Sequence, residues 1–202
     1  PENNVQDAII ENNEIEIQNN TGTAINGILT SNSKNITFNK NKLTVNSSIA
    51  EAFSGGMVNT NNTITFNGEV NILVNKPREY NGNNITFNNR LGAIAQYFVG
   101  TIDWNSDIKN NNFEINFEET ESNKKSIILM FNGGTLDNHI VTFDGNTVKY
   151  DKGNTRANLI YLLNLQDQTP QTINITNNKI SGYNGGWKNQ GQAEHIIKIE
   201  NN

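Results

Sequence analysis

The chain contains no cysteine, and it has little proline, arginine and tryptophan. With 0 Cys in 202 residues, a disulfide-stapled fold and thiolate metal sites are excluded. The absence is compatible with passage through an oxidising compartment, because no thiol of this chain can mispair there. Helical patterns are also scarce, since almost no segment keeps apolar residues at i, i+3, i+4 and i+7 over several turns. A sandwich of helices and sheet is therefore not expected.

Long apolar runs and basic clusters are missing as well. No run of 18 apolar residues occurs, so the sequence predicts no membrane-spanning helix. The segment Pro1 to Asn4 lacks the basic and then apolar pattern of a signal peptide. The formal net charge is −5, and the few Lys and Arg are scattered apart from Lys124-Lys125. Nucleic acid is not expected as a partner, because no basic stripe is available to neutralise phosphates.

Asparagine dominates what is present. The chain has 42 Asn, while hydrophobic residues make up 34%, so the core must be thin and repeated. Asn tolerates left-handed backbone, caps turns with its side chain and can stack in ladders, which suits a fold with many turns. Base bias in the coding sequence is the competing explanation for the Asn content.

A short strand is repeated almost letter for letter at 35–39, 63–67 and 84–88, each reading Ile-Thr-Phe-Asn after one polar residue. When looser copies are added to these three, the first apolar residue of each copy lies at 15, 36, 64, 85, 115, 141, 173 and 197. The intervals run from 21 to 32 residues and average 26. Periods of this length predict stacked units that bury their apolar faces only against their neighbours.

This spacing favours an all-β parallel β-helix, a solenoid with about seven coils, over an antiparallel sandwich. A sandwich would have turns at steady spacings of about 8 to 12 residues, whereas each repeat here has room for three short strands and three turns. Unequal intervals then imply loops of different length that protrude from a fixed coil. No linker divides the chain, so we expect residues 1–202 to form a single β-helix segment. The repeat runs through both termini, which suggests a fragment of a longer protein.

Local patterns refine this expectation. The run 127–131 is the most apolar and should be the driest strand, and 91–99 favours a buried strand over a short helix. The segment 47–62 is a loop candidate, in which Ile49 to Phe53 can make one helical turn. Residues 141–150 fit either a hairpin or a coil corner at Asp144-Gly145. Residues 181–192 are predicted to form a Gly- and Asn-rich loop.

Several short motifs carry a resemblance to a known family. Phe-x-x-Asn occurs at 38–41, 113–116 and 143–146, and Gly-Gly or Gly-Ala followed by apolar residues occurs at 55–58, 91–94 and 133–136. In this texture the chain resembles the passenger domains of bacterial autotransporters, of the polymorphic membrane protein or vacuolating-cytotoxin type. The resemblance covers about residues 14–200. It implies a right-handed parallel β-helix displayed at the cell surface or secreted, with a signal peptide and a translocating barrel outside this chain.

An enzyme is the rival class, because polysaccharide lyases and glycoside hydrolases also use β-helices. Such sites need clustered acids, often with Arg or Lys, yet Arg78, Arg90 and Arg156 stand apart from any paired acids. Asp103 and Asp107 frame a segment that fits a calcium loop, a sugar platform or, more simply, a solvated turn. The two histidines, at 139 and 195, share no metal motif. We therefore expect no catalytic residue, no metal and no cofactor.

Aromatic residues outside the repeat positions are the candidates for binding, namely Trp104, Tyr183 and Trp187. Packing across the base of a loop is the competing interpretation for all three. The leading hypothesis is a surface-displayed or secreted bacterial passenger segment that acts in adhesion or host-receptor binding. Its partner would be a host-cell surface protein or glycan, or a second copy of the chain. The alternatives are a carbohydrate-active β-helix enzyme and a purely structural spacer.

Overall fold

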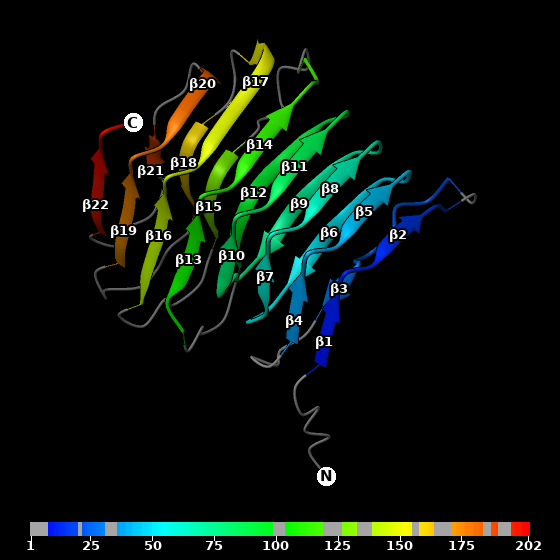
Figure 1. The fold of residues 1–202 in the computed structure, drawn as a ribbon. Helices are drawn as coiled ribbons and strands as arrows, with labels where there is room; N and C mark the ends of the chain where they lie inside the picture. The colour runs from blue at the N-terminus through cyan, green and yellow to red at the C-terminus, as the bar shows by residue number, and fades with distance from the viewer. Residues whose placement is uncertain are drawn as a thin grey trace.

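The computed structural model describes residues 8–19, 22–30, 36–98, 104–118, 127–132, 139–154, 158–163, 171–183, 187–189 and 195–202. Within these ranges every regular element is a β-strand, and the strands assemble into three parallel sheets. The strands lie in chain order along the stack, as the blue-to-red colouring shows (Figure 1). The chain is thus a parallel β-helix, as the repeat predicts, in which each coil adds one strand to each sheet.

Sheet A contains the first strand of each coil. Its strands are β1 (Ala8–Glu11), β4 (Ile36–Asn39), β7 (Val58–Thr60), β10 (Glu79–Asn81), β13 (Ser106–Lys109), β16 (Ile140–Asp144), β19 (Gln171–Thr176) and β22 (His195–Glu200).

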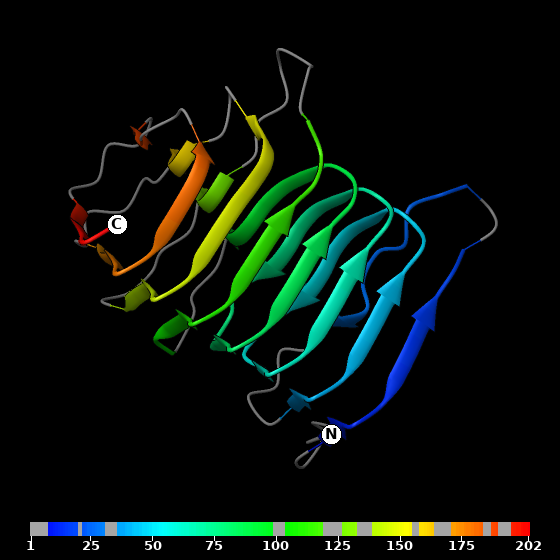
Figure 2. The same ribbon diagram turned by 45° about the horizontal axis from the view of Figure 1, so that its top comes forward.

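Sheet B follows after a two-residue corner. Its strands are β2 (Glu14–Ile17), β5 (Lys42–Val45), β8 (Thr63–Phe66), β11 (Asn84–Phe87), β14 (Asn112–Ile115), β17 (Thr147–Asn154) and β20 (Lys179–Tyr183). The parallel stacking of this sheet is plainest in Figure 2.

Sheet C completes each coil. Its strands are β3 (Leu29–Thr30), β6 (Ile49–Ser54), β9 (Val70–Asn75), β12 (Leu91–Phe98), β15 (Ile127–Asn132), β18 (Asn158–Leu163) and β21 (Trp187–Asn189). The described strands therefore make seven three-stranded coils and begin an eighth at β22, which agrees with the predicted number.

The corner between sheets A and B has the same form in every coil. Its first residue has positive φ, between 53° and 67°, which Asn and Gly tolerate best. These residues are Asn12, Lys40, Asn61, Gly82, Asn110, Gly145, Asn177 and Asn201. The second corner residue is always Asn, so the abundant Asn of the sequence has a defined structural position in each coil.

These second residues form a continuous asparagine ladder, made of Asn13, Asn41, Asn62, Asn83, Asn111, Asn146, Asn178 and Asn202. From Asn41 onward, each side-chain Oδ1 accepts from the backbone N–H and the Nδ2 of the ladder residue in the preceding coil, at 2.8–3.2 Å. Each Nδ2 also donates to a backbone carbonyl at 2.6–3.1 Å. The ladder thereby satisfies polar groups that the corner would otherwise bury unpaired.

The interior is filled mainly by columns of apolar side chains at the inward positions of each sheet, with Asn59 and Ser106 as buried polar members. Phe66 and Phe87 stack with ring centroids 5.4 Å apart, and Tyr97 and Phe131 stack at 4.7 Å. The run 127–131 is dry as predicted, with all of its side chains buried except that of Met130. Parallel stacking of like residues therefore supplies the core that a single coil cannot make.

Two predicted loops are strands instead. The segment 47–62 holds β6 and β7, and part of 181–192 holds the end of β20 and the whole of β21, so both loop predictions were wrong there. Neither segment has a convincing strand pattern of its own. Each is strand because its backbone pairs with neighbouring coils, as β6 does with β9 and β21 does with β18.

The sequence repeat was also aligned across two different sheets. Ile36 lies in β4 of sheet A, whereas Ile64 and Ile85 lie in sheet B, where Ile64 is the register partner of both Ile85 and Leu43. The period near 26 was right for the number of coils, but the first positions 36, 141, 173 and 197 lie in sheet A, whereas 15, 64, 85 and 115 lie in sheet B. The segment 141–150 is a corner between parallel strands, which decides between the two interpretations left open there.

Candidate functional site

The outer face of sheet C is irregular where β6 and β9 lie side by side. In β6, Ala50 and Glu51 are both partly exposed, and the next two residues are both buried. In β9, Asn71 and Ile72 repeat this departure from strict alternation, again followed by two buried residues. The next outward side chain therefore comes three residues on, at Ser54 in β6 and at Asn75 in β9. Between the row that contains Glu51 and Ile72 and the row that contains Ser54 and Asn75, a strip of the sheet surface carries no outward side chain.

Small residues on β12 deepen this strip. Ala93 is the register partner of Ile72, so a methyl group stands where β9 carries a larger side chain. Beside it, Gly92 lets the backbones approach closely, since a Cβ at this position would lie 2.4 Å from the carbonyl oxygen of Asn71. The result is a hollow of about 250 Å³ across β6, β9 and β12.

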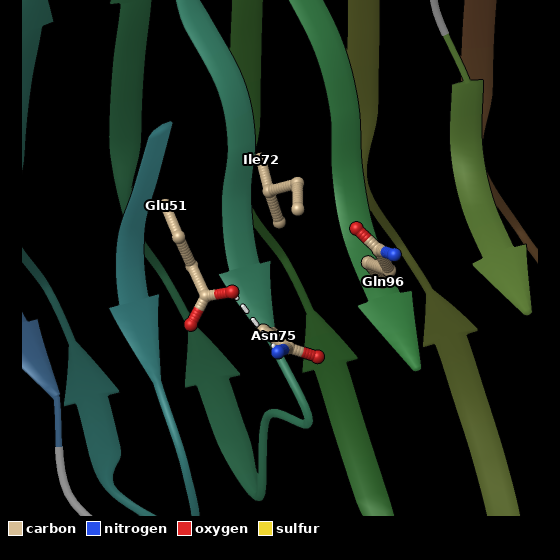
Figure 3. A pocket seen from close by; sticks show the side chains of 4 residues that line it. All are labelled: Glu51, Ile72, Asn75 and Gln96. Carbon is tan, nitrogen blue, oxygen red and sulfur yellow. Dashed lines mark hydrogen bonds between the residues drawn. The ribbon is translucent and has the colours of Figure 1, made fainter. Parts of the chain in front are cut away.

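The hollow is lined by Glu51, Ile72, Asn75 and Gln96, and we call it the sheet C hollow (Figure 3). Asn75 Nδ2 donates to Glu51 Oε2 at 3.0 Å, which fixes both side chains across neighbouring strands. Asn75 and Gln96 are register partners, so their amides stand in adjacent coils. Gln96 is only 5% exposed, and therefore its amide is held largely out of solvent.

One polar atom of this hollow is unsatisfied. Asn75 Oδ1 is buried and has no hydrogen-bond partner among the described residues. In Figure 3 this oxygen points away from Glu51, toward the side of the hollow where Gln96 lies. A buried acceptor without a donor costs about 1–3 kcal/mol, so such an atom is uncommon unless a ligand or water satisfies it. The hollow therefore contains a buried acceptor that no donor among the described residues satisfies.

The predicted binding residue Trp104 is engaged within the fold. Its side chain is partly buried against the core, and its indole Nε1 donates to the carbonyl oxygen of Pro77 at 3.2 Å. The ring covers Gly56, where a Cβ would come within 3.2 Å of the indole. These contacts agree with the packing alternative for Trp104, which is not among the residues that line the sheet C hollow.

The other two aromatic candidates lie in strands. Tyr183 ends β20 and has Asn154 as its register partner, and Trp187 begins β21 opposite Ile160. The two therefore belong to different sheets of the same coil. The structure does not bring either of them to β6, β9 or β12, which line the sheet C hollow.

The segment around Asp107 also makes structural contacts. Asp103 lies outside the described residues, whereas Asp107 forms an ion pair with Lys109 at 2.8 Å. Asn105 Oδ1 accepts from the backbone N–H of Ile140, and the Ser106 hydroxyl lies 2.7 Å from that of Tyr97. Burial raises the pKa of Tyr97, so its hydroxyl stays protonated and the pair stays neutral.

Sequence reasoning missed the sheet C hollow because its residues fall in stretches without a motif. Glu51 lies in the segment interpreted as a loop, and Asn75 is one of many Asn. The signal that was available is the pair of small residues Gly92 and Ala93 inside an apolar run, because small residues in a strand often mark a close approach or a depression. Gln96 in that same buried run is the second sign.

No group of three or more His, Asp or Glu side chains within the described ranges could hold a metal ion. Among those same residues, no helix is long and apolar enough to cross a membrane. The chain matches no protein-family model, no curated protein and no solved structure.

Proposed function

We propose that this chain is a rigid binding segment of a surface-displayed or secreted bacterial passenger, acting in adhesion or host-receptor binding. The surface location comes from the resemblance of the sequence to autotransporter passengers. The binding role is supported by one observation above all, the buried and unpartnered Oδ1 of Asn75, a residue that lines the sheet C hollow. A scaffold of stacked strands holds such an atom in place at little entropic cost, which favours recognition.

In this proposal the sheet C hollow binds its ligand and catalyses no reaction. Glu51 is the one carboxylate lining the sheet C hollow, and its Oε2 already accepts from Asn75. Glycoside hydrolysis generally requires two carboxyl groups about 5–10 Å apart, one on each side of the bond to be cleaved. A single carboxylate between two amides matches recognition of a ligand better than proton transfer.

A cell-binding assay tests the proposal. The purified chain, labelled with a fluorophore, is titrated onto cultured host epithelial cells, and bound fluorescence is measured against concentration. We expect saturable binding that Asn75→Ala weakens and Asn67→Ala leaves unchanged, because Asn67 is an exposed Asn directly after β8 and does not line the hollow. Absence of saturable binding to cells, and to the chain itself, contradicts the proposal.

A structural spacer is the second candidate, and the asparagine ladder favours it. The ladder links every described corner between sheets A and B, which makes the stack stiff along its length. Deletion of residues 63–83 removes one whole coil and leaves Asn62 to stack on Asn111. If the chain is only a spacer, the longer passenger that carries it should keep its full cell binding after this deletion, whereas a binding segment that uses Asn75 would lose it.

A further inference from the structure

We propose that the sheet C hollow binds one neutral hexose unit of a glycan through two adjacent hydroxyl groups. This inference rests on the binding function proposed above and names the ligand class of the same site. It follows from four properties of the hollow, namely its excess of hydrogen-bond acceptors, its apolar side, its size and its negative charge.

The hydrogen-bond balance calls for a ligand that donates. Asn75 Oδ1 has no donor among the described residues, and Glu51 adds a carboxylate whose Oε2 accepts from the Nδ2 of Asn75. A hydroxyl on one ring carbon can donate to Asn75 Oδ1 while its neighbour donates to Glu51. The amide of Gln96 can then donate to either hydroxyl, since a hydroxyl both donates and accepts.

The apolar side and the size select a ring. Ile72 lines the hollow next to these polar groups, with Ala93 as its register partner. A hexose carries C–H groups on one face and hydroxyls at its edge, so it matches this pairing of Ile72 with polar side chains. The volume of about 250 Å³ falls below the range of about 300–1,000 Å³ typical of pockets for larger ligands, which favours a single ring.

Charge selects a neutral sugar. Glu51 stands at the hollow, and the chain carries a formal net charge of −5. A uronate or sialate would bring its carboxylate toward the carboxylate of Glu51, which is repulsive in a partly desolvated site. Neutral hexoses avoid this cost. A single ring in a shallow site gives a dissociation constant on the order of 1 mM, which repeated display on a surface converts into useful avidity.

Nuclear magnetic resonance of the complete ¹⁵N-labelled chain tests this inference. The probes are the methyl glycosides of glucose, galactose and mannose, with methyl glucuronide as the acidic counterpart. We expect at least one neutral glycoside to shift the side-chain amides of Asn75 and Gln96 saturably, with a dissociation constant on the order of 1 mM. The glucuronide should bind about tenfold more weakly.

Two variants and one control make the result specific. Asn75→Ala should lose about tenfold in affinity for the neutral glycoside, because its acceptor is gone. Asn67→Ala should bind as the wild type does. Should Asn75→Ala fail to fold, Glu51→Gln serves instead, and it should abolish the discrimination against the glucuronide.

Three outcomes overturn the inference. These are no shift of either amide at tens of millimolar glycoside, an unchanged shift of the Gln96 side-chain amide in Asn75→Ala, and a tighter response to calcium chloride alone, which would make the hollow a cation site. Saturable cell binding with no response to the glycosides overturns this inference and leaves the proposed function standing. A response to the glycosides without any cell binding overturns the proposed function and leaves the glycan site standing.

Discussion

Replacing Asn83 with alanine tests how much the asparagine ladder stabilises the coil. Asn83 is only 1% exposed, and its side chain makes four hydrogen bonds. Its Oδ1 accepts from the backbone N–H and the Nδ2 of Asn62, both at 2.9 Å. Its Nδ2 donates to the carbonyl oxygen of Asn59 and to Asn111 Oδ1, both at 3.0 Å. Alanine removes all four and leaves the buried N–H of Asn62 without its acceptor.

The expected loss follows from these contacts. A typical intramolecular hydrogen bond contributes about 0.5–1.5 kcal/mol net, so four of them amount to about 2–6 kcal/mol. The upper part of this range is too high, because the Nδ2 of Asn62 keeps its bonds to Phe38 and Asn59. We therefore expect Asn83→Ala to lower the free energy of unfolding by about 3 kcal/mol, a large share of the about 5–15 kcal/mol typical of a folded domain.

Urea titration followed by far-ultraviolet circular dichroism measures this loss. The matched control is Asn88→Ala, which removes two bonds of an exposed Asn row just after the sheet B strands, to Asn67 at 2.8 Å and from Asn116 at 3.1 Å. Water replaces these bonds, so the control should change stability by less than about 0.5 kcal/mol. Because solenoids can unfold coil by coil, hydrogen exchange at the neighbouring corner amides should accompany the titration.

The reasoning is refuted if Asn83→Ala costs less than about 1 kcal/mol or no more than Asn88→Ala. Either result would mean that the ladder amides exchange their partners for water at no cost, and that apolar stacking alone fixes the corner.

Three further perturbations have expected outcomes. Gly92→Ala should lower the free energy of unfolding by about 1–3 kcal/mol, since its Cβ would meet the Asn71 carbonyl at 2.4 Å, and an unchanged urea midpoint would contradict that contact. The Thr176 hydroxyl, which donates to Asp144 at 2.5 Å, lowers the pKa of Asp144 below its ordinary 3.8. Its stabilisation is thus full above about pH 3.8 and is lost as the pH falls further, so Asp144→Asn should lose less stability than the wild type in acid urea titrations. Trp104→Ala should cost about 2 kcal/mol by lost packing, whereas lost cell binding at unchanged stability would make Trp104 a binding residue.

The architecture could be predicted from the sequence because each type of repeated segment fits only one structural environment. Alternation such as that of Thr63 to Phe66 buries every second side chain, and it marks a strand in any context. Apolar runs such as 127–131 can be satisfied only in a dry interior. The period near 26 then fixed the number of coils, since neither short strands nor single coils can bury these faces alone.

Sheet membership was beyond the reach of the sequence. The same sequence, Ile-Thr-Phe, occurs in β4 of sheet A and in β8 and β11 of sheet B. Both sheets present one face inward, so the same alternation suits either of them. Only the stacking of Asn41 on Asn62 and of Asn62 on Asn83 sets which strand lies on which.

By itself the sequence determined an all-β stack of about seven coils and an Asn-rich set of turns, because periodicity and turn chemistry are local properties. Only the tertiary structure decided that Glu51, Asn75 and Gln96 meet in one hollow and that Trp104 packs inward over Gly56. The physical reason is that parallel register brings together residues 21 to 24 positions apart, and no local pattern encodes which outward side chains will share a surface.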